Sequence, residues 1–407
     1  MKMKTEPIPR EHYMSILRES KDSDFIKVLT GIRRCGKSTL MLMFLDEIKH
    51  LGVPEEKTVY INLDDEELEI NDFRDLLSRI REEIGDYEGS YIFIDEVQNV
   101  KEWERAVSTL YLNGADVYVT GSNTQMLSTD ISGKLSGRCQ QIRVRPLIFS
   151  EYLDFREPGD TTEIFMDYLR YGGFPSVALA MDAMPSQVIG ILDGIYNTVF
   201  TKDVVLRNSI RNASTVRNLL RYLMKNIGDR TSVRGAANYM TSKGMKVQAQ
   251  TVEQYIDALE HAQLFDRVGR MDSKSKEYLR TSDKFYASDL GIRNNLIPFS
   301  ERDLDGILEN LVYNELMFRY GEAAVYSVDG YEVDFIANPR GSPSYYQVCT
   351  DISEKSTRER ELRSLKAISD NYPKTVITFE KYPLRDIDGI RIVNIQDWLL
   401  EGKPPQA

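Results

Sequence analysis

The chain has 407 residues, of which 42% are hydrophobic and 28% are charged, and its formal net charge is −11. This composition is typical of a soluble protein with two or three domains, and the sequence contains no apolar run of 18 or more residues and no signal-peptide pattern. Only three cysteines occur, without a CxxC pair or a histidine cluster. That argues against a disulfide framework and a structural zinc site, and it favours a cytoplasmic protein.

Strand-like and helix-like patterns alternate over residues 1–150, which predicts an α/β domain with a parallel sheet covered on both faces. Residues 151–213 are helical in texture and are expected to form a linker or lid. The expected strands are 25–30, 58–63, 90–95, 116–120 and 140–144, and the expected helices are 11–19, 38–50, 70–84 and 101–112.

Residues 214–300 show three helical patterns followed by two strand-like runs around a polar turn, which is the order of a winged helix. Residues 301–407 begin with a helix and continue with strands and a second helix, which predicts a further α/β domain. The three helices of the winged helix are expected at 214–226, 231–242 and 249–263, and its hairpin strands at 264–270 and 277–286. The C-terminal strands are expected at 324–328, 331–337, 344–349, 374–379 and 390–394.

Residues 31–38 read Gly-Ile-Arg-Arg-Cys-Gly-Lys-Ser, a complete G-x4-G-K-S phosphate loop between an expected strand and helix. Backbone N–H groups of such a loop, and the helix that follows it, bind phosphate oxygens. Lys37 is expected to reach the β- and γ-phosphates and Ser38 to hold Mg²⁺. Cys35 is interpreted as a small residue on a tight turn, and one of the two loop arginines is expected to face solvent. The candidate nucleotide-binding residues are Gly31, Arg33, Arg34, Cys35, Gly36, Lys37, Ser38 and Thr39.

A second motif, Tyr-Ile-Phe-Ile-Asp-Glu, covers residues 91–96 and predicts a buried strand that ends in two carboxylates. Ligands of open α/β sheets bind at the carboxyl ends of the strands. Asp95 is therefore expected to support Mg²⁺, and Glu96 to act as the general base that polarises the attacking water.

Polar residues follow the fourth expected strand and precede the fifth. Ser122, with Asn123 as the second choice, is expected to orient the water or to sense the γ-phosphate, although a plain polar turn would use the same residues. Arg138 is a candidate for stabilising charge in the transition state, either in its own chain or on a neighbouring subunit. A solvated arginine on a glycine turn is the alternative for this residue.

These motifs together resemble AAA-type ATPases, and most closely a widespread prokaryotic group in which an AAA-like domain precedes a C-terminal domain of unknown function. The resemblance implies ATP binding and hydrolysis, a winged helix and a nuclease-like C-terminal fold. The segments that carry it are Arg33–Ser38, Asp95–Gln98, Thr120–Ser122, Pro146–Tyr152, Tyr171–Pro175, Lys284–Gly291 and Glu332–Ile336.

The C-terminal region looks similar to restriction-type nucleases of the D…(D/E)-x-K class. Glu309 and Asp334 take two of the acidic positions, but Gln347 and Cys349 stand where that class has a carboxylate and a lysine. A neutral amide is a poor ligand for a hard metal ion, so a degenerate site without nuclease activity is expected.

The third helix of the predicted winged helix carries Glu253, Asp257 and Glu260 and neither lysine nor arginine. Its acids are expected on the open face, where they would repel DNA phosphates. Residues 201–287 nevertheless hold 16 lysines and arginines against 9 acids, so weak, sequence-tolerant DNA binding is one interpretation and a lid with a solvated basic face is the other. The candidate DNA contacts are Arg267, Arg270, Lys274, Lys276 and Arg280.

The leading hypothesis is a Mg²⁺-dependent ATPase whose nucleotide state moves the C-terminal domains. A slow NTP-gated interaction switch with a protein or DNA partner is the alternative, and a DNA-processing enzyme is a weaker one. Oligomerisation is compatible with all three.

Overall fold

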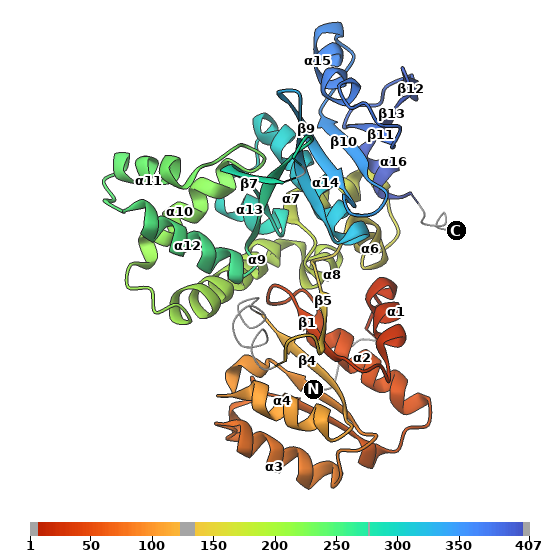
Figure 1. Cartoon of the computed structure of the whole chain (residues 1–407), viewed down its shortest axis with the longest axis vertical. Coiled ribbons are helices and arrows are strands. Elements are labelled where there is room, and N and C mark those ends of the chain that lie inside the picture. Colours follow the sequence, from red (N-terminus) through yellow and green to blue (C-terminus); the bar gives the residue numbers. More distant parts are fainter. Residues whose placement is uncertain (1–6, 123–134, 276, 402–407) are drawn as a thin grey trace. The chain divides into compact units, whose positions relative to one another are not determined.

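The computed structural model describes residues 7–122, 135–275 and 277–401, without the side chains of 278–281 (Figure 1). The chain divides into two units, of which the first comprises Met1–Arg145 with His261–Gln263 and the second comprises Pro146–Glu260 with Leu264–Ala407. None of the helices in these described ranges combines the length and the apolar character that a membrane span requires.

Five strands form the sheet of the first unit in the order β2-β3-β4-β1-β5, and every neighbouring pair is parallel. Three of the strands are buried along their whole length or nearly so, as expected of a sheet covered on both faces. This confirms the predicted α/β fold with a parallel sheet. The strands are β1 (Ile26–Thr30), β2 (Thr58–Asn62), β3 (Tyr91–Asp95), β4 (Asp116–Gly121) and β5 (Cys139–Arg143).

Helices cover both faces of this sheet because successive strand residues point to opposite sides. Ile92 and Ile94 pack with apolar residues of α3 and α4. Phe93 points to the other face, where its ring stacks on Tyr118 and meets Phe44 of α2. The helices of the unit are α1 (Glu11–Ser20), α2 (Lys37–His50), α3 (Phe73–Ile84) and α4 (Trp103–Leu112), with short 3-10 turns η1 (Glu55–Lys57), η2 (Glu66–Leu68) and η3 (Val97–Asn99).

The second unit contains an eight-stranded mixed sheet in the order β12-β13-β11-β10-β9-β8-β6-β7. Its strands are β6 (Phe265–Asp272), β7 (Tyr278–Ala287), β8 (Ala323–Val328), β9 (Tyr331–Ala337), β10 (Ser344–Cys349), β11 (Lys374–Thr378), β12 (Asp386–Ile387) and β13 (Ile390–Asn394). Its first helices are α6 (Phe149–Asp154), α7 (Thr161–Tyr171), α8 (Pro175–Ala183) and α9 (Val188–Thr198), followed by the π-helix η6 (Val199–Leu206). The later helices are α10 (Ala213–Lys225), α11 (Val233–Ser242), α12 (Ala249–His261), α13 (Leu290–Leu296), α14 (Leu304–Tyr320), α15 (Lys355–Lys366) and α16 (Ile395–Leu399), and the remaining 3-10 turns are η5 (Pro185–Gln187) and η7 (Glu301–Asp303).

The hairpin β6–β7 follows α10, α11 and α12 in the order expected of a winged helix, but it is not a free wing. Strand β6 pairs in parallel with β8, with Arg270 opposite Val325. The expected domain boundary at residue 300 therefore separates strands of one continuous sheet (Figure 1). The winged helix and the nuclease-like domain stay predictions, and the expected lid at 151–213 lies within this same unit.

A buried carboxylate joins two sequence motifs in the second unit. Asp289 caps α13, where its Oδ1 accepts the N–H of Ile292 at 3.1 Å, and its Oδ2 accepts the N–H of Gly173 at 2.7 Å. Gly173 belongs to the Tyr-Gly-Gly-Phe-Pro motif and Asp289 to the Ser-Asp-Leu-Gly motif. Burial raises the pKa of Asp289 to about 6. The two motifs are thus parts of one hydrogen-bonded junction.

Replacement of Asp289 by alanine should lower the free energy of unfolding by about 2–4 kcal/mol, because buried N–H groups would lose their acceptor. The matched control is Asp160→Ala, since Asp160 also caps a helix but accepts, within the described ranges, from Thr162 and Glu163 of its own helix alone. That change should cost about 1 kcal/mol. Urea unfolding of both variants measures the difference, and equal losses would contradict the junction.

The loss in the free energy of unfolding caused by Asp289→Ala should depend on pH. The pKa of Asp289 is about 6 in the folded chain and near the ordinary 3.8 once unfolded. A raised folded-state pKa means that the group's stabilising contribution is complete below about pH 4 and is lost as the pH rises through about 6. The difference between wild type and Asp289→Ala should therefore be larger at pH 5 than at pH 8.

Candidate functional site

The phosphate loop joins the end of β1 to the start of α2 as the sequence predicts. Gly36 has φ = 104°, a backbone conformation that glycine adopts without strain, and Lys37 is the first residue of the helix. The Lys37 side chain is buried, and its Nζ donates to the carbonyls of Gly31 at 2.8 Å and Ile32 at 3.3 Å. An ammonium group and the amino end of a helix are therefore held by one loop, which is an arrangement suited to a phosphate anion.

Close packing at the start of the loop explains two of its residues. A Cβ on Gly31 would lie 2.2 Å from the carbonyl oxygen of Val144, so a larger residue does not fit. Cys35 is fully buried, and its Sγ donates to the same carbonyl at 3.3 Å. The side chain of Cys35 thus holds the loop against the chain after β5, while Ser38 and Thr39 lie half-buried in the first turn of α2.

Arg10, which precedes α1, is a site residue that sequence reasoning missed. Its guanidinium is buried and donates to the carbonyls of Cys35 at 3.1 Å and Arg145 at 2.8 Å. The N–H of Arg145 in turn donates to the hydroxyl of Tyr13 at 3.0 Å. The entry segment therefore braces the phosphate loop, and no local pattern in the sequence distinguishes such a buried arginine from a surface one.

The two loop arginines differ in their surroundings. Arg34 is exposed and has φ = 71°. Arg33 lies inward, with its guanidinium 3.4 Å from Oδ2 of Asp64 and 3.8 Å from Oε2 of Glu96. The loop thus reaches the acidic end of β3, although β4 lies between β3 and β1 in the sheet.

Asp95 ends β3 as a buried carboxylate that is held by two hydroxyl groups. The hydroxyl of Tyr60 donates to Oδ2 at 2.9 Å, and the hydroxyl of Thr120 donates to Oδ1. Burial, and then the Asp95 carboxylate, raise the pKa of the Tyr60 phenol, so Tyr60 keeps its proton as a donor. Thr120 Oγ1 also accepts the N–H of Glu96 at 2.9 Å. Neither hydroxyl was among the expected site residues.

Glu96 follows in the left-handed backbone region, with φ = 57°, and is buried. The side-chain amide of Gln98 donates to its Oε2, and the same Nε2 lies 3.5 Å from Oγ of Ser122. Ser122 is fully buried at the end of β4. Glu96 and Ser122 are therefore brought together through Gln98, whereas Asn123 lies outside the described residues.

Arg138 lies at the opposite end of the strands, where β1 and β5 begin. It precedes β5, whose first residue Cys139 pairs with Ile26 at the start of β1. The phosphate loop begins at Gly31, beyond the other end of that strand and five residues from Ile26, which is about 16 Å at 3.3 Å per residue. The Arg138 guanidinium instead stacks on Tyr111, 5.7 Å from the ring centroid. This placement excludes the alternative in which Arg138 serves the nucleotide of its own chain, and the role toward a neighbouring subunit stays a prediction.

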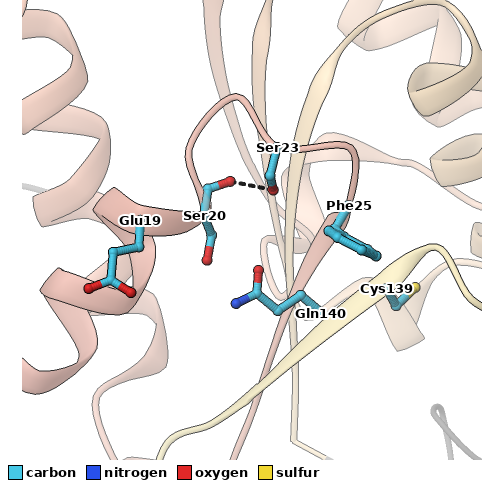
Figure 2. Close-up of a pocket in the computed structure, with 6 residues that line it drawn as sticks. All are labelled: Glu19, Ser20, Ser23, Phe25, Cys139 and Gln140. Carbon is cyan, nitrogen blue, oxygen red and sulfur yellow. Dashed lines mark hydrogen bonds between the residues drawn. The ribbon is translucent and has the colours of Figure 1, made fainter.

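An open pocket of about 500 Å³ lies at this same end of the strands, where β1 and β5 begin (Figure 2). Figure 2 shows Phe25 and Gln140 on the two neighbouring chain segments, with the hydroxyl of Ser23 bonded to the carbonyl of Ser20. The pocket is thus remote from the phosphate loop. Its lining residues are Glu19, Ser20, Ser23, Phe25, Cys139 and Gln140.

In the second unit, Glu309 and Asp334 lie around a lysine that sequence reasoning missed. Lys284 of β7 is buried, with its Nζ 2.7 Å from Glu309 Oε1, 3.0 Å from Glu332 Oε1 and 3.9 Å from Asp334 Oδ1. The Tyr286 hydroxyl also donates to Glu309. Burial raises the pKa of Asp334 well above its ordinary value. The Lys284 ammonium therefore occupies the centre of this acidic cluster.

Gln347 and Cys349 lie on the neighbouring strand β10 and add no charge. The amide of Gln347 donates to Glu361 at 3.0 Å and accepts from Ser364 at 3.2 Å. Burial and the nearby carboxylates raise the pKa of the Cys349 thiol, which keeps it protonated. Over the described residues, no group of three or more acidic, histidine or cysteine side chains is arranged to hold a metal ion.

The expected DNA-contacting surface differs from the structure in two ways. Arg267 is half-buried and bonded to Glu253 at 2.6 Å and Asp283 at 2.5 Å, so its charge is already neutralised. The acids of α12 are not on an open face, since Glu253, Asp257 and Glu260 are all half-buried. Burial raises the pKa of Glu260 to about 7.

The remaining candidate contacts are less constrained or lie beyond what the structure describes. Lys274 is exposed and lies 3.2 Å from Asp329, and Arg270 is half-buried. Lys276 and the side chain of Arg280 are outside the described part of the chain.

Family models match two segments of this chain. A model described as an AAA domain matches residues 23–153, and a model of a domain of unknown function matches residues 162–303. Among solved structures, the chain is similar to a Walker-type ATPase of Pyrococcus abyssi with a TM-score of 0.52 and 16% identity, over 71% of this chain and 96% of that one. This likeness shows a shared fold.

Two relatives match along nearly the whole chain. An uncharacterized protein of Haemophilus influenzae is 33% identical over 97% of this chain and 99% of its own length. An uncharacterized protein of Methanocaldococcus jannaschii is 30% identical over 92% of this chain and 88% of its own length. The chain therefore belongs to a family of AAA-type P-loop ATPases in which the AAA domain is followed by a domain of unknown function.

Proposed function

We propose that this chain binds ATP at the phosphate loop and hydrolyses it, and that the nucleotide state changes the conformation of the C-terminal region. The observation that carries the proposal is the contact between Arg33 of the loop and Glu96 at the end of β3. It joins the phosphate-binding element to the acidic strand end, so a phosphate held by Lys37 would lie beside a carboxylate that can accept a proton.

The residues present fit a magnesium ion that is bound together with substrate phosphates. Mg²⁺ prefers oxygen ligands and keeps several waters in such sites, and Ser38 and Asp95 supply a hydroxyl and a carboxylate. Ser38 would hold the ion, and Asp95 would support it through water. When bound, Mg²⁺ would neutralise charge on the β- and γ-phosphates.

Within this mechanism each side chain has a separate task. Lys37 binds the β- and γ-phosphates, and the Tyr60 and Thr120 hydroxyls keep Asp95 oriented. Thr120 also fixes the backbone of Glu96. Glu96 takes a proton from the attacking water, and Ser122 senses the γ-phosphate.

A slow NTP-gated interaction switch is the second candidate. The ion pair between Arg33 and Glu96 favours it, because this contact links the phosphate loop to the end of β3 and can change when a nucleotide binds. A partner that stimulates turnover would identify the switch. Among the described side chains, weak DNA contact stays part of this candidate through Arg270 and Lys274, since Arg267 is already neutralised.

Replacement of Glu96 by glutamine should lower the turnover of ATP by about 10²- to 10⁴-fold and leave ATP binding intact, because only the proton acceptor is lost. Lys37→Ala should instead weaken ATP binding itself, and Lys49→Ala, a change at an exposed position near the far end of α2, is the control for both. Phosphate release and binding of a fluorescent ATP analogue measure the two effects. Undiminished turnover in Glu96→Gln would contradict the assignment of Glu96 as the general base.

Arg138 should act on a neighbouring copy of the chain, because it lies about 16 Å along β1 from its own phosphate loop. Arg138→Ala and Glu96→Gln should each be inactive alone. When mixed, they should regain part of the wild-type turnover, since some interfaces would pair an intact Arg138 with an intact Glu96. Titration of one variant into the other measures this recovery, and its absence at every ratio would show that Arg138 does not act in this way.

The C-terminal region should not cleave DNA with Mg²⁺ or Mn²⁺, because its acidic cluster is already neutralised by the Lys284 ammonium and Gln347 adds no carboxylate. Incubation of supercoiled and linear DNA with wild type and with Asp334→Ala tests this. Cleavage by wild type that disappears in Asp334→Ala would restore the DNA-processing alternative.

A further inference from the structure

The side-chain amide of Gln98 links the two residues that flank the expected attacking water. Its Nε2 donates to Oε2 of Glu96 and lies 3.5 Å from Oγ of Ser122. The orientation of the amide follows from chemistry, because a carboxylate only accepts hydrogen bonds and the NH₂ end must face it. Gln98 thus connects the turn after β3 with the end of β4.

The other end of this amide is an acceptor with nothing bonded to it. Oε1 of Gln98 is buried and has no hydrogen-bond partner among the described residues. A buried polar atom without a partner costs free energy, so such an atom beside a proposed catalytic carboxylate is a place where a water molecule would be bound favourably. Both atoms belong to one planar amide, so a molecule that donates to Oε1 would lie beside the Glu96 carboxylate.

We propose that Gln98 is a water-positioning residue of the ATPase reaction, whose Oε1 accepts one O–H of the attacking water while Oε1 of Glu96 accepts the other. This inference rests on the proposed function. Oε2 of Glu96 is occupied by Gln98 and approached by Arg33 at 3.8 Å, which leaves its Oε1 for the water.

The reaction step is balanced with these groups. The water oxygen forms a bond to the γ-phosphorus, and the bond from the γ-phosphorus to the bridging oxygen breaks with its electron pair going to ADP. One proton of the water passes to Glu96, and the other stays on the inorganic phosphate. Gln98 exchanges no proton, and it acts by fixing where the water oxygen points, which is worth about 100-fold in rate when lost.

The test is Gln98→Met, which keeps the length of the side chain and removes both its donor and its acceptor. Turnover of ATP should fall about 100-fold while the dissociation constant of a fluorescent ATP analogue and the midpoint of thermal unfolding stay unchanged. Gln140→Met is the matched control, since Gln140 lines the pocket at the opposite end of the strands of the same sheet (Figure 2). It should leave all three quantities unchanged.

The split between kcat and KM separates positioning from a structural role. Gln98→Met should lower kcat and leave the KM for ATP near its wild-type value, because the contact to the attacking water is made by Gln98 and the binding of ATP is not. A structural role would change KM or the midpoint of thermal unfolding together with kcat.

The outcomes are distinct. Wild-type turnover that depends on Glu96 but is changed less than about threefold by Gln98→Met would overturn this inference and leave the proposed function standing. Loss of nucleotide binding in Gln98→Met would also overturn it, because Gln98 would then act on binding. Absence of turnover in wild type would remove the proposed function and this inference together.

Discussion

A carboxylate that is buried at the end of a parallel strand must have its oxygens hydrogen-bonded, because an unpaired buried charge costs several kcal/mol. At Asp95 the hydroxyls of Tyr60 and Thr120 meet this requirement. The same Thr120 oxygen accepts the N–H of Glu96. The hydroxyl that stabilises the buried Asp95 carboxylate therefore also positions the backbone of Glu96, the proposed base. The three neighbouring strands β2, β3 and β4 therefore supply one hydrogen-bonded group of polar atoms at the carboxyl ends of the strands.

The same requirement organises the second unit around other groups. Lys284 is buried, and it is stable there because the carboxylates of Glu309 and Glu332 surround its ammonium. The pKa of Lys284 is raised although burial alone would lower it, since these carboxylates favour the charged form. Asp289 satisfies backbone N–H groups of two separate segments. Charges in this unit thus connect segments that are far apart along the chain.

The parallel sheet and the phosphate loop could be predicted because their signals are local, such as an apolar run, a glycine-rich turn and a helix. The long-range partners could not. Arg10, Tyr60 and Lys284 act through contacts with residues far along the chain, and no spacing in the sequence marks them. For Arg138 the sequence left open whether it serves its own chain or a neighbouring one, because its motif gives the neighbouring strand but not which end of that strand meets the loop. The acids of α12 were expected in solvent because helical periodicity shows one buried face and not what packs against the other.

The parallel pairing of β6 with β8 determines where the chain can be divided and affects how it folds during synthesis. The match to the domain of unknown function ends at residue 303, while the sheet that contains β6 and β7 continues to β13. A segment cut at that point would expose the edge of β6 and separate Lys284 from its carboxylates. During synthesis β6 leaves the ribosome well before β8, so its edge waits unpaired in the growing chain. The strands on the two sides of residue 303 therefore belong to one sheet, and we expect that a chain cut there does not fold as two separate domains.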